Sequence, residues 1–437
     1  MKKLFLVTGL LILSVTGAFA QRLQARFVTS AYVWQRQDSI GTSSNHLFGY
    51  QTIQLSVAGE KLSFHTYLQG FNDFAGPVKN DGVLRVYNFY FKASNIAQLA
   101  DVSLGRQAVF AGVGTGTIDG GLASLKFLDS RLKLVGYYGS LPSERYKFSL
   151  VSNASDNFMT GAQLVASPAD FAQISVSYMD KHIRPETYMG IRRDSLFNPY
   201  LTEIKPSAAA EEYVSGDINL EYNDVISGYG RYDYDLLSDK NSRIQFFGRV
   251  KPFGSLNVKA LEPLSLTVEY VQRDPRILYN SIFSVFTFNS LKEFEIGGEY
   301  AISNDWQAFA KYGTVSFNDA TQNQVTLGLN GKHVSMSFTR DNGDGGELSA
   351  ASMNVGYPFF ENKLTPTLLV GYAHYKLSEY SASLDAALSV GVGAVYRPST
   401  LLSVDAQVQW IQNKIYNSDT RFFIRVNYLL SKQLGIF

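Results

Sequence analysis

The segment 420–430 (TRFFIRVNYLL) alternates between two kinds of side chain. One set of alternate positions is wholly apolar or aromatic: Phe422, Ile424, Val426, Tyr428 and Leu430. The positions between them include two arginines and an asparagine. A period of two residues indicates a β-strand whose side chains point to opposite faces. An apolar face backed by a charged face is typical of a strand that lies between lipid and water.

A strand in lipid needs a hydrogen-bonded partner on each edge, because lipid cannot satisfy free backbone N–H and C=O groups. We therefore expect this strand to pair with the first strand of the exported chain, around Arg22–Gln37. Turn signals such as Asn330-Gly331 recur between the alternating segments. Counting the hairpins gives about 22 strands, and any even number from about 16 to 22 fits. The predicted fold is all-β: a single closed antiparallel transmembrane β-barrel, without a plug domain because a strand begins close to Gln21.

The first 20 residues have the pattern of a secretory signal peptide. Lys2 and Lys3 precede an apolar run, and Ala18-Phe19-Ala20 provides a cleavage-type ending before Gln21. The run is shorter than the ~20 apolar residues that a spanning helix needs. The sequence therefore predicts a signal peptide at 1–20 and an outer-membrane barrel at 21–437, with both termini of the barrel in the bacterial periplasm.

The composition excludes several functions. The chain has no cysteine, which rules out disulfides, thiolate metal sites, thioether-bound haem and a lipid-modified N-terminal cysteine. Its 39 Lys and Arg balance 38 Asp and Glu, so no net field recruits nucleic acid. The histidines His46, His65, His182 and His374 have no metal-ligand spacing. We therefore predict no cofactor and expect the partners to be outer-membrane lipid and small hydrophilic solutes.

Strand alternation also predicts which charged side chains line the lumen. The inward positions include Arg231, Asp233, Arg243, Arg249, Lys251, Glu269, Arg273, Glu293, Glu295 and Glu299. A basic strand thus lies one strand away from an acidic strand. Two interpretations remain open at this point. The charges create a transverse field that selects solutes, or they form cross-strand salt bridges that only tile the wall.

The segment 104–121 (LGRQAVFAGVGTGTIDGG) is the most distinctive local sequence. It resembles the Gly-Arg-Gln strand end and following Asp-Gly segment of porin-like barrels of the alginate-export type, and the exported chain is similar in pattern to Gram-negative porins. The resemblance implies a passive channel for carbohydrate or another anionic solute, with Arg106 and Gln107 at a constriction. Counted from Leu104, however, Arg106 points outward unless Gly105 forms a bulge. The glycine-rich part is either a plain flexible loop or a loop that narrows the pore.

Catalysis is not expected. His333 and Ser335 have the spacing of the His-x-Ser pair that outer-membrane lipid hydrolases share. By alternation, though, both side chains face the lumen, and both follow a turn at the periplasmic rim. Those hydrolases act on lipid from the outer face, so the sequence predicts that this chain is not an enzyme.

Two long loops have compositions that are unusual for exposed connections. Ile183–Ala210 carries several arginines and three prolines, and Arg273–Ser290 contains the apolar run 282–286 (IFSVF). An apolar run outside lipid needs a cover. It either folds inward onto the barrel wall or contacts a partner protein or a second copy of the chain.

These observations together favour a passive outer-membrane channel for small hydrophilic solutes, with anionic or carbohydrate solutes as the class that the resemblance implies. The alternative is a structural barrel that acts as a sheath or scaffold for a periplasmic or surface partner, such as an electron-carrying subunit. Steady conductance of the purified barrel would favour the first, and conductance only with a partner would favour the second.

Overall fold

The computed structural model describes residues 22–38, 41, 43–74, 84–143, 146, 155–184, 187–205, 209–251, 261–275, 290–376 and 383–433. The predicted signal peptide and the apolar run 282–286 lie outside these residues. No helix in the described ranges is long and apolar enough to cross a membrane.

The described chain is built from β-strands. Their bounds are β1 (Arg22–Asp38), β2 (Ser43–Ala58), β3 (Leu62–Asp73), β4 (Leu84–Ile96), β5 (Ala100–Ala111), β6 (Gly114–Phe127), β7 (Leu132–Ser140), β8 (Phe158–Ala169), β9 (Ala172–Ile183), β10 (Tyr188–Arg193), β11 (Pro199–Ile204), β12 (Ala209–Tyr222), β13 (Ile226–Asp235), β14 (Lys240–Val250), β15 (Leu264–Arg273), β16 (Leu291–Ser303), β17 (Trp306–Phe317), β18 (Ala320–Gly331), β19 (Val334–Gly343), β20 (Gly346–Gly356), β21 (Leu364–Lys376), β22 (Asp385–Ser399), β23 (Leu402–Gln412) and β24 (Tyr416–Gln433).

All strands except β10 and β11 form one 22-stranded antiparallel sheet, and this sheet closes on itself. The closing seam joins β1 to β24, with Phe27 opposite Tyr428 and Ala31 opposite Ile424. The other edge of β1 pairs with β2. The structure therefore confirms the predicted fold class, the strand number and the pairing of the last strand with the first.

The outer face of the barrel is apolar. Large side chains are exposed at alternate positions on many strands, for example Val176 on β9, Phe246 on β14, Ile296 on β16, Val392 on β22 and Val408 on β23. An apolar surface of this extent is unstable in water, and lipid is the solvent that covers it in transmembrane barrels. Because side chains alternate along a strand, the residues between them face the lumen.

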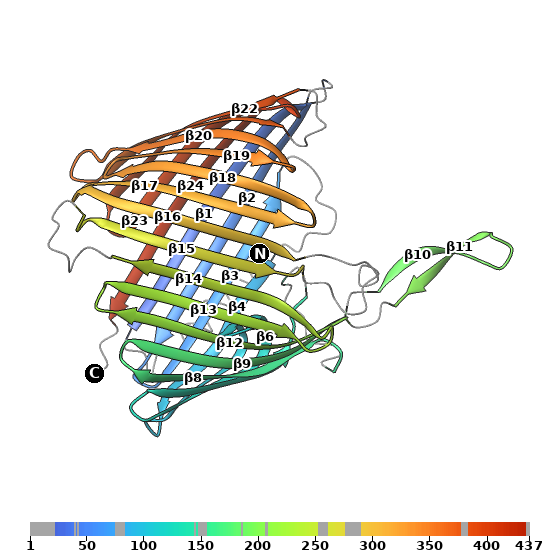
Figure 1. The fold of residues 1–437 in the computed structure, drawn as a ribbon. Helices are drawn as coiled ribbons and strands as arrows, with labels where there is room; N and C mark the ends of the chain where they lie inside the picture. The colour runs from blue at the N-terminus through green and yellow to red at the C-terminus, as the bar shows by residue number, and fades with distance from the viewer. Residues whose placement is uncertain are drawn as a thin grey trace.

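The two ends of the barrel differ. At the end where β1 begins and β24 finishes, most strands are joined by short turns, such as the one that follows Phe127. Except for the connection between β14 and β15, the longer connections lie at the opposite end, including those between β7 and β8 and between β9 and β12. The β10–β11 pair belongs to the second of these and projects from this end as a separate two-stranded sheet (Figure 1). We call the two ends the turn rim and the loop rim.

Candidate channel lumen

One hairpin leaves the barrel wall. Strand β5 pairs with β4 only as far as Arg106, and β6 pairs with β7 only from Asp119 onward. Beyond these points β5 and β6 pair with each other alone, up to Ala111 opposite Gly114. Residues 107–118 therefore form a two-stranded hairpin with no strand on either side, which we call the inner hairpin.

The inner hairpin folds into the lumen and lies on the inner face of β7, β8 and β9. The backbone N–H of Val113 donates to Ser177 Oγ on β9 at 2.9 Å. This contact passes over the two intervening strands, so the hairpin tip covers the wall from inside. The sequence left open whether this segment is a plain flexible loop or a loop that narrows the pore. It lies inside the barrel, which favours the second alternative.

Glycines allow this close approach. Gly112 turns the chain with φ of +61°, and a Cβ there would lie 2.0 Å from Ser177 Oγ. A Cβ at Gly114 would lie 1.9 Å from the Tyr137 hydroxyl oxygen. Both distances are far below van der Waals contact, and glycine avoids them because it has no side chain. The alternating glycines of the motif are therefore explained by packing against the wall.

A small apolar core forms where the hairpin meets the wall. Its buried members come from the hairpin and from four wall strands: Val109, Ala111, Val113, Ile118, Val135, Tyr137, Met159, Met179 and Tyr213. Met159 and Ile118 are completely buried. Burial of this completeness is typical of a protein core rather than of a pore lining. This part of the lumen is therefore filled.

The other face of the inner hairpin is open. Ala108, Phe110 and Thr115 are exposed on it, and Phe110 is 83% exposed. Because the buried face lies on the wall, this exposed face points toward the remaining lumen. The hairpin reduces the open cross-section of the barrel and presents an aromatic ring to whatever passes.

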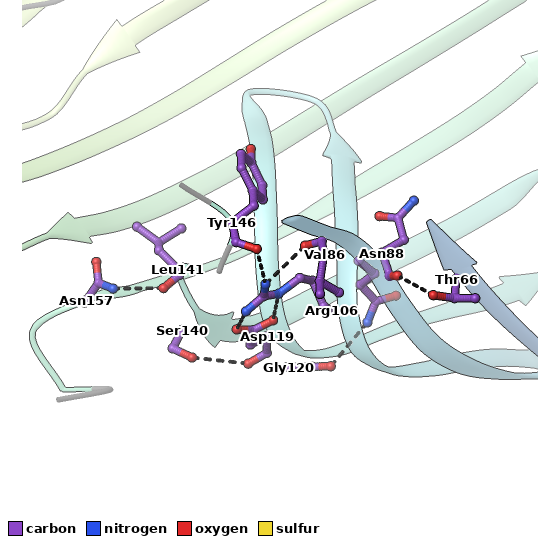
Figure 2. A network of polar contacts seen from close by, with 11 residues as sticks. Thr66, Val86, Asn88, Arg106, Asp119, Gly120, Ser140, Leu141, Tyr146 and Asn157 are labelled. Carbon is purple, nitrogen blue, oxygen red and sulfur yellow. Dashed lines mark hydrogen bonds and ion pairs between the residues drawn. The ribbon is translucent and has the colours of Figure 1, made fainter. Parts of the chain in front are cut away.

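Arg106 holds the root of the hairpin rather than lining the open lumen (Figure 2). Its guanidinium donates to both carboxylate oxygens of Asp119, each at 2.6 Å. It also donates to the carbonyl oxygens of Val86 at 3.1 Å and Tyr146 at 3.4 Å. The side chain is only 6% exposed. Bidentate charge-assisted pairs are among the strongest polar contacts in proteins, so this one fixes the point where the hairpin leaves the wall.

Arg106 therefore does not lie at a constriction of the open lumen, as the resemblance implied. The β4–β5 register has no shift at Gly105, so no bulge resets the face there. Instead, β5 leaves β4, and the side that would have faced lipid turns toward Val86 and Tyr146. Gln107 is also buried: its amide donates to the carbonyl oxygens of Ser103 and Gly120, each at 3.2 Å.

The wall formed by β13 to β17 carries the charged residues that the sequence placed inside, and we call it the charged wall. Ion pairs join most of them across or along the strands. The shortest atom distances are 2.7 Å for Arg231–Asp233, 3.4 Å for Arg249–Glu299, 3.2 Å for Arg273–Glu293 and 2.8 Å for Lys311–Glu295. Lys311 on β17 also faces inward and is the ion-pair partner of Glu295.

The remaining predicted residues of this wall also have polar neighbours or lie at the rim. Glu269 accepts from Gln245 at 3.2 Å, and Arg243 donates to the same glutamine. Lys251 directly follows β14 at the turn rim and is exposed. Asp233 is completely buried, whereas the side chain of Arg273 is 57% exposed. These ion pairs are of the kind that the salt-bridge interpretation expects, and the partly exposed ones, such as Arg273–Glu293, stay in contact with lumenal water.

A third part of the inner face, on β1 to β3, is aromatic. The rings of Trp34 and His46 stack with centroids 4.2 Å apart, and the row continues through Phe48 and Phe71. The Arg36 guanidinium lies 4.2 Å from the Trp34 ring centroid, which is cation–π distance. The rings of this aromatic row were not among the predicted lumen residues. Its signal was the alternation of His46, Phe48 and Tyr50 on one strand face.

No protein-family model matches the chain, and no curated protein matches it. Among solved structures, the P pilus usher (PapC) translocation pore aligns with a TM-score of 0.46 and 7% identity, over 94% of this chain and 100% of the other. OccAB4 of Acinetobacter baumannii aligns with a TM-score of 0.46 and 8% identity, over 95% and 99%.

The outer-membrane protein OpdK of Pseudomonas aeruginosa is a further structure of this kind, with a TM-score of 0.41 and 11% identity over 95% of this chain and 100% of the other. These similarities are too low to support an argument about function. The barrel architecture of this chain rests on its own strand pairing.

Proposed function

We propose that the chain is a passive channel of the bacterial outer membrane for small hydrophilic solutes, narrowed by the inner hairpin. Support comes from the apolar outer face, which suits lipid, and from the polar inner face, which suits water. The observation that carries the proposal is that one side of the inner face is filled and the other is open to water. The hairpin fills the side at β7 to β9, and the charged wall stays half-exposed to the remaining space.

The charged wall is the candidate for solute preference. Arg249, Arg273, Glu293 and Glu299 are paired, yet each keeps more than a quarter of its side chain exposed. Exposed ion pairs contribute little to stability, so their charges remain free to act on ions that pass. Anionic and carbohydrate solutes remain the class to be tested first, and Phe110 on the hairpin is the apolar surface that they would meet.

Recording from purified protein in planar bilayers tests this function. We expect steady single-channel conductance in salt, and swelling of proteoliposomes in small sugars and organic anions but not in large oligosaccharides. A barrel that is folded and inserted but does not conduct would contradict the proposal. Folding is checked independently by resistance of the barrel to unfolding in cold detergent.

A scaffold function is the second candidate, and the β10–β11 hairpin favours it. Leu196 and Phe197 at its tip are 78% and 75% exposed. The tip is ordered, because Asp194 Oδ1 accepts from the backbone N–H groups of Leu196 and Asn198, each at 2.8 Å. The bond from Asn198 is the main cause that lowers the pKa of Asp194, so the carboxylate stays charged near neutral pH.

An ordered, exposed apolar tip suits contact with a partner protein or a second copy of the chain. The predicted contact region Ile183–Ala210 includes this tip. If the scaffold function is the main one, the purified barrel will not conduct until the partner is added. Deleting residues 187–205 will then abolish the partner-dependent signal. If the channel function is the main one, the same deletion will leave conductance in salt unchanged.

A further inference from the structure

A recess of about 510 Å³ opens on the inner face of β20 to β24. Its lining comes from five successive strands and includes Asn354, Thr367, Asp405, Gln407, Phe423 and Arg425. The volume lies within the ~300–1,000 Å³ of typical small-molecule sites. The recess is separate from both the inner hairpin and the charged wall, because none of its lining residues belongs to either.

Glycines hollow the floor of the recess. Gly391 and Gly393 on β22 occupy inward positions, between outward residues such as Val392, which is exposed. A Cβ at Gly393 would lie 2.9 Å from Thr367 Oγ1 and 3.0 Å from the Ala406 carbonyl oxygen. Side chains at these positions would therefore fill the space. Glycine in a strand interior weakens the strand, so two of them here indicate a requirement for close approach by backbone or ligand.

The polar groups of the recess include side-chain amides, one ion pair and one further arginine, Arg397. The Arg425 guanidinium donates to Asp405 through Nε, at 2.7 Å, and also through Nη2. These two charges compensate each other, whereas Arg397 has no ion-pair partner among the described residues and gives the recess one net positive charge. The side-chain amides of Asn354 and Gln407 also line the recess, and in the described part of the chain neither has a hydrogen-bond partner. Each amide offers both a donor and an acceptor.

Phe423 supplies the apolar surface. Its ring lies within the lining, and the Arg425 guanidinium is 5.8 Å from its centroid. Across the seam, Tyr32 of β1 is the register partner of Phe423. Tyr32 therefore lies opposite Phe423 on the neighbouring strand.

We propose that the recess is a subsite for a saccharide that passes through the channel, an inference that rests on the proposed channel function. The C–H face of a sugar ring fits the Phe423 ring, and its hydroxyl groups fit the amides and the Asp405–Arg425 pair. An apolar solute would leave these polar groups unpaired, which is costly. A cation would meet the unpaired Arg397 guanidinium, whereas the hydroxyl groups of a saccharide pair with the amides and with the Asp405–Arg425 ion pair.

Equilibrium dialysis of purified barrel against labelled maltose tests the subsite without relying on conductance, in a detergent that has no sugar headgroup. We expect saturable maltose binding to the wild type, and binding to Phe423→Ala weakened about tenfold. Gly391→Val, which places methyl groups in the recess, is expected to weaken binding similarly. Phe309→Ala on β17 removes an inner-wall ring outside the recess and should bind as the wild type does. Protonated glucosamine is expected to compete less well than glucose, because Arg397 repels a cation.

The outcomes separate the two proposals. No saturable maltose binding would overturn the subsite, as would equal loss in Phe423→Ala and Phe309→Ala or stronger competition by protonated glucosamine than by glucose. Salt conductance of the same preparations tests the channel independently. A barrel that conducts but does not bind maltose keeps the channel and loses the subsite. A barrel that binds maltose as described but does not conduct loses the channel and keeps the subsite as a binding site.

Discussion

Two regions of the inner face follow the same strand alternation but do opposite things. Under the inner hairpin, Tyr137, Met159 and Met179 are at most 4% exposed and form a core. On the charged wall, the Arg249 and Arg273 side chains are 41% and 57% exposed and are paired across strands. The difference is what covers each region: another piece of the chain in one case, and water in the other. Alternation predicts that a side chain faces inward, but not which of these it meets.

This comparison predicts the largest difference for equivalent changes to arginine. Arg106→Met leaves the Asp119 carboxylate, whose side chain is only 19% exposed, without its partner and should lower the free energy of unfolding by about 3–5 kcal/mol. Arg273→Met removes the same group from an exposed pair and should cost no more than about 1 kcal/mol. Urea unfolding of the two variants in lipid vesicles measures both. Equal costs would mean that the hairpin root is not the buried structural site described above.

The apolar core gives the next effect. Met159→Ala empties part of a completely buried space and should cost about 2–5 kcal/mol. Phe247→Ala on β14 removes a larger side chain that is only half-buried, and we expect a smaller cost despite its size. If Phe247→Ala proves the more destabilising of the two under the same unfolding conditions, the hairpin is not packed as a core.

Changes to the charged wall should have the smallest effect on stability and the largest effect on ion selectivity. Arg243→Gln with Arg249→Gln should move the reversal potential in a salt gradient toward cations. Glu295→Gln with Glu299→Gln should move it toward anions, because Lys311 and Arg249 then lose their counter-charges. Both shifts should shrink at 1 M salt, where the Debye length is about 3 Å. Unchanged selectivity at low salt in both double variants would show that these pairs only tile the wall.

The barrel was predictable because lipid imposes a simple rule on it. Each strand must place apolar side chains outward and pair on both edges, so the alternation of 420–430 was enough to predict closure on β1. The same rule placed the charged residues of β13 to β16 inside. It also raised the alternative that these charges form salt bridges rather than select solutes, because opposite charges on neighbouring strands lie within reach of one another.

The inner hairpin was not predictable in the same way. Its position depends on where β5 stops pairing with β4, and alternation within a single strand does not report that. Arg106 follows Leu104 in parity, yet it is buried because the strand leaves the wall. The glycine-rich sequence marked the segment as unusual. Its partners Tyr137, Ser177 and Met159 are far away in sequence, so the contact required the structure.

The measurement that tests the central claim most directly is the conductance of a barrel without the tip of the inner hairpin. Gln107 and Ile118 are register partners, so replacing residues 108–117 with Asn-Gly closes them by a two-residue turn. The Arg106–Asp119 pair stays in place as the root. We expect this variant to fold and to have a higher single-channel conductance than the wild type, because the hairpin no longer occupies the lumen. A folded variant with unchanged or lower conductance would contradict the claim that the hairpin narrows an open channel.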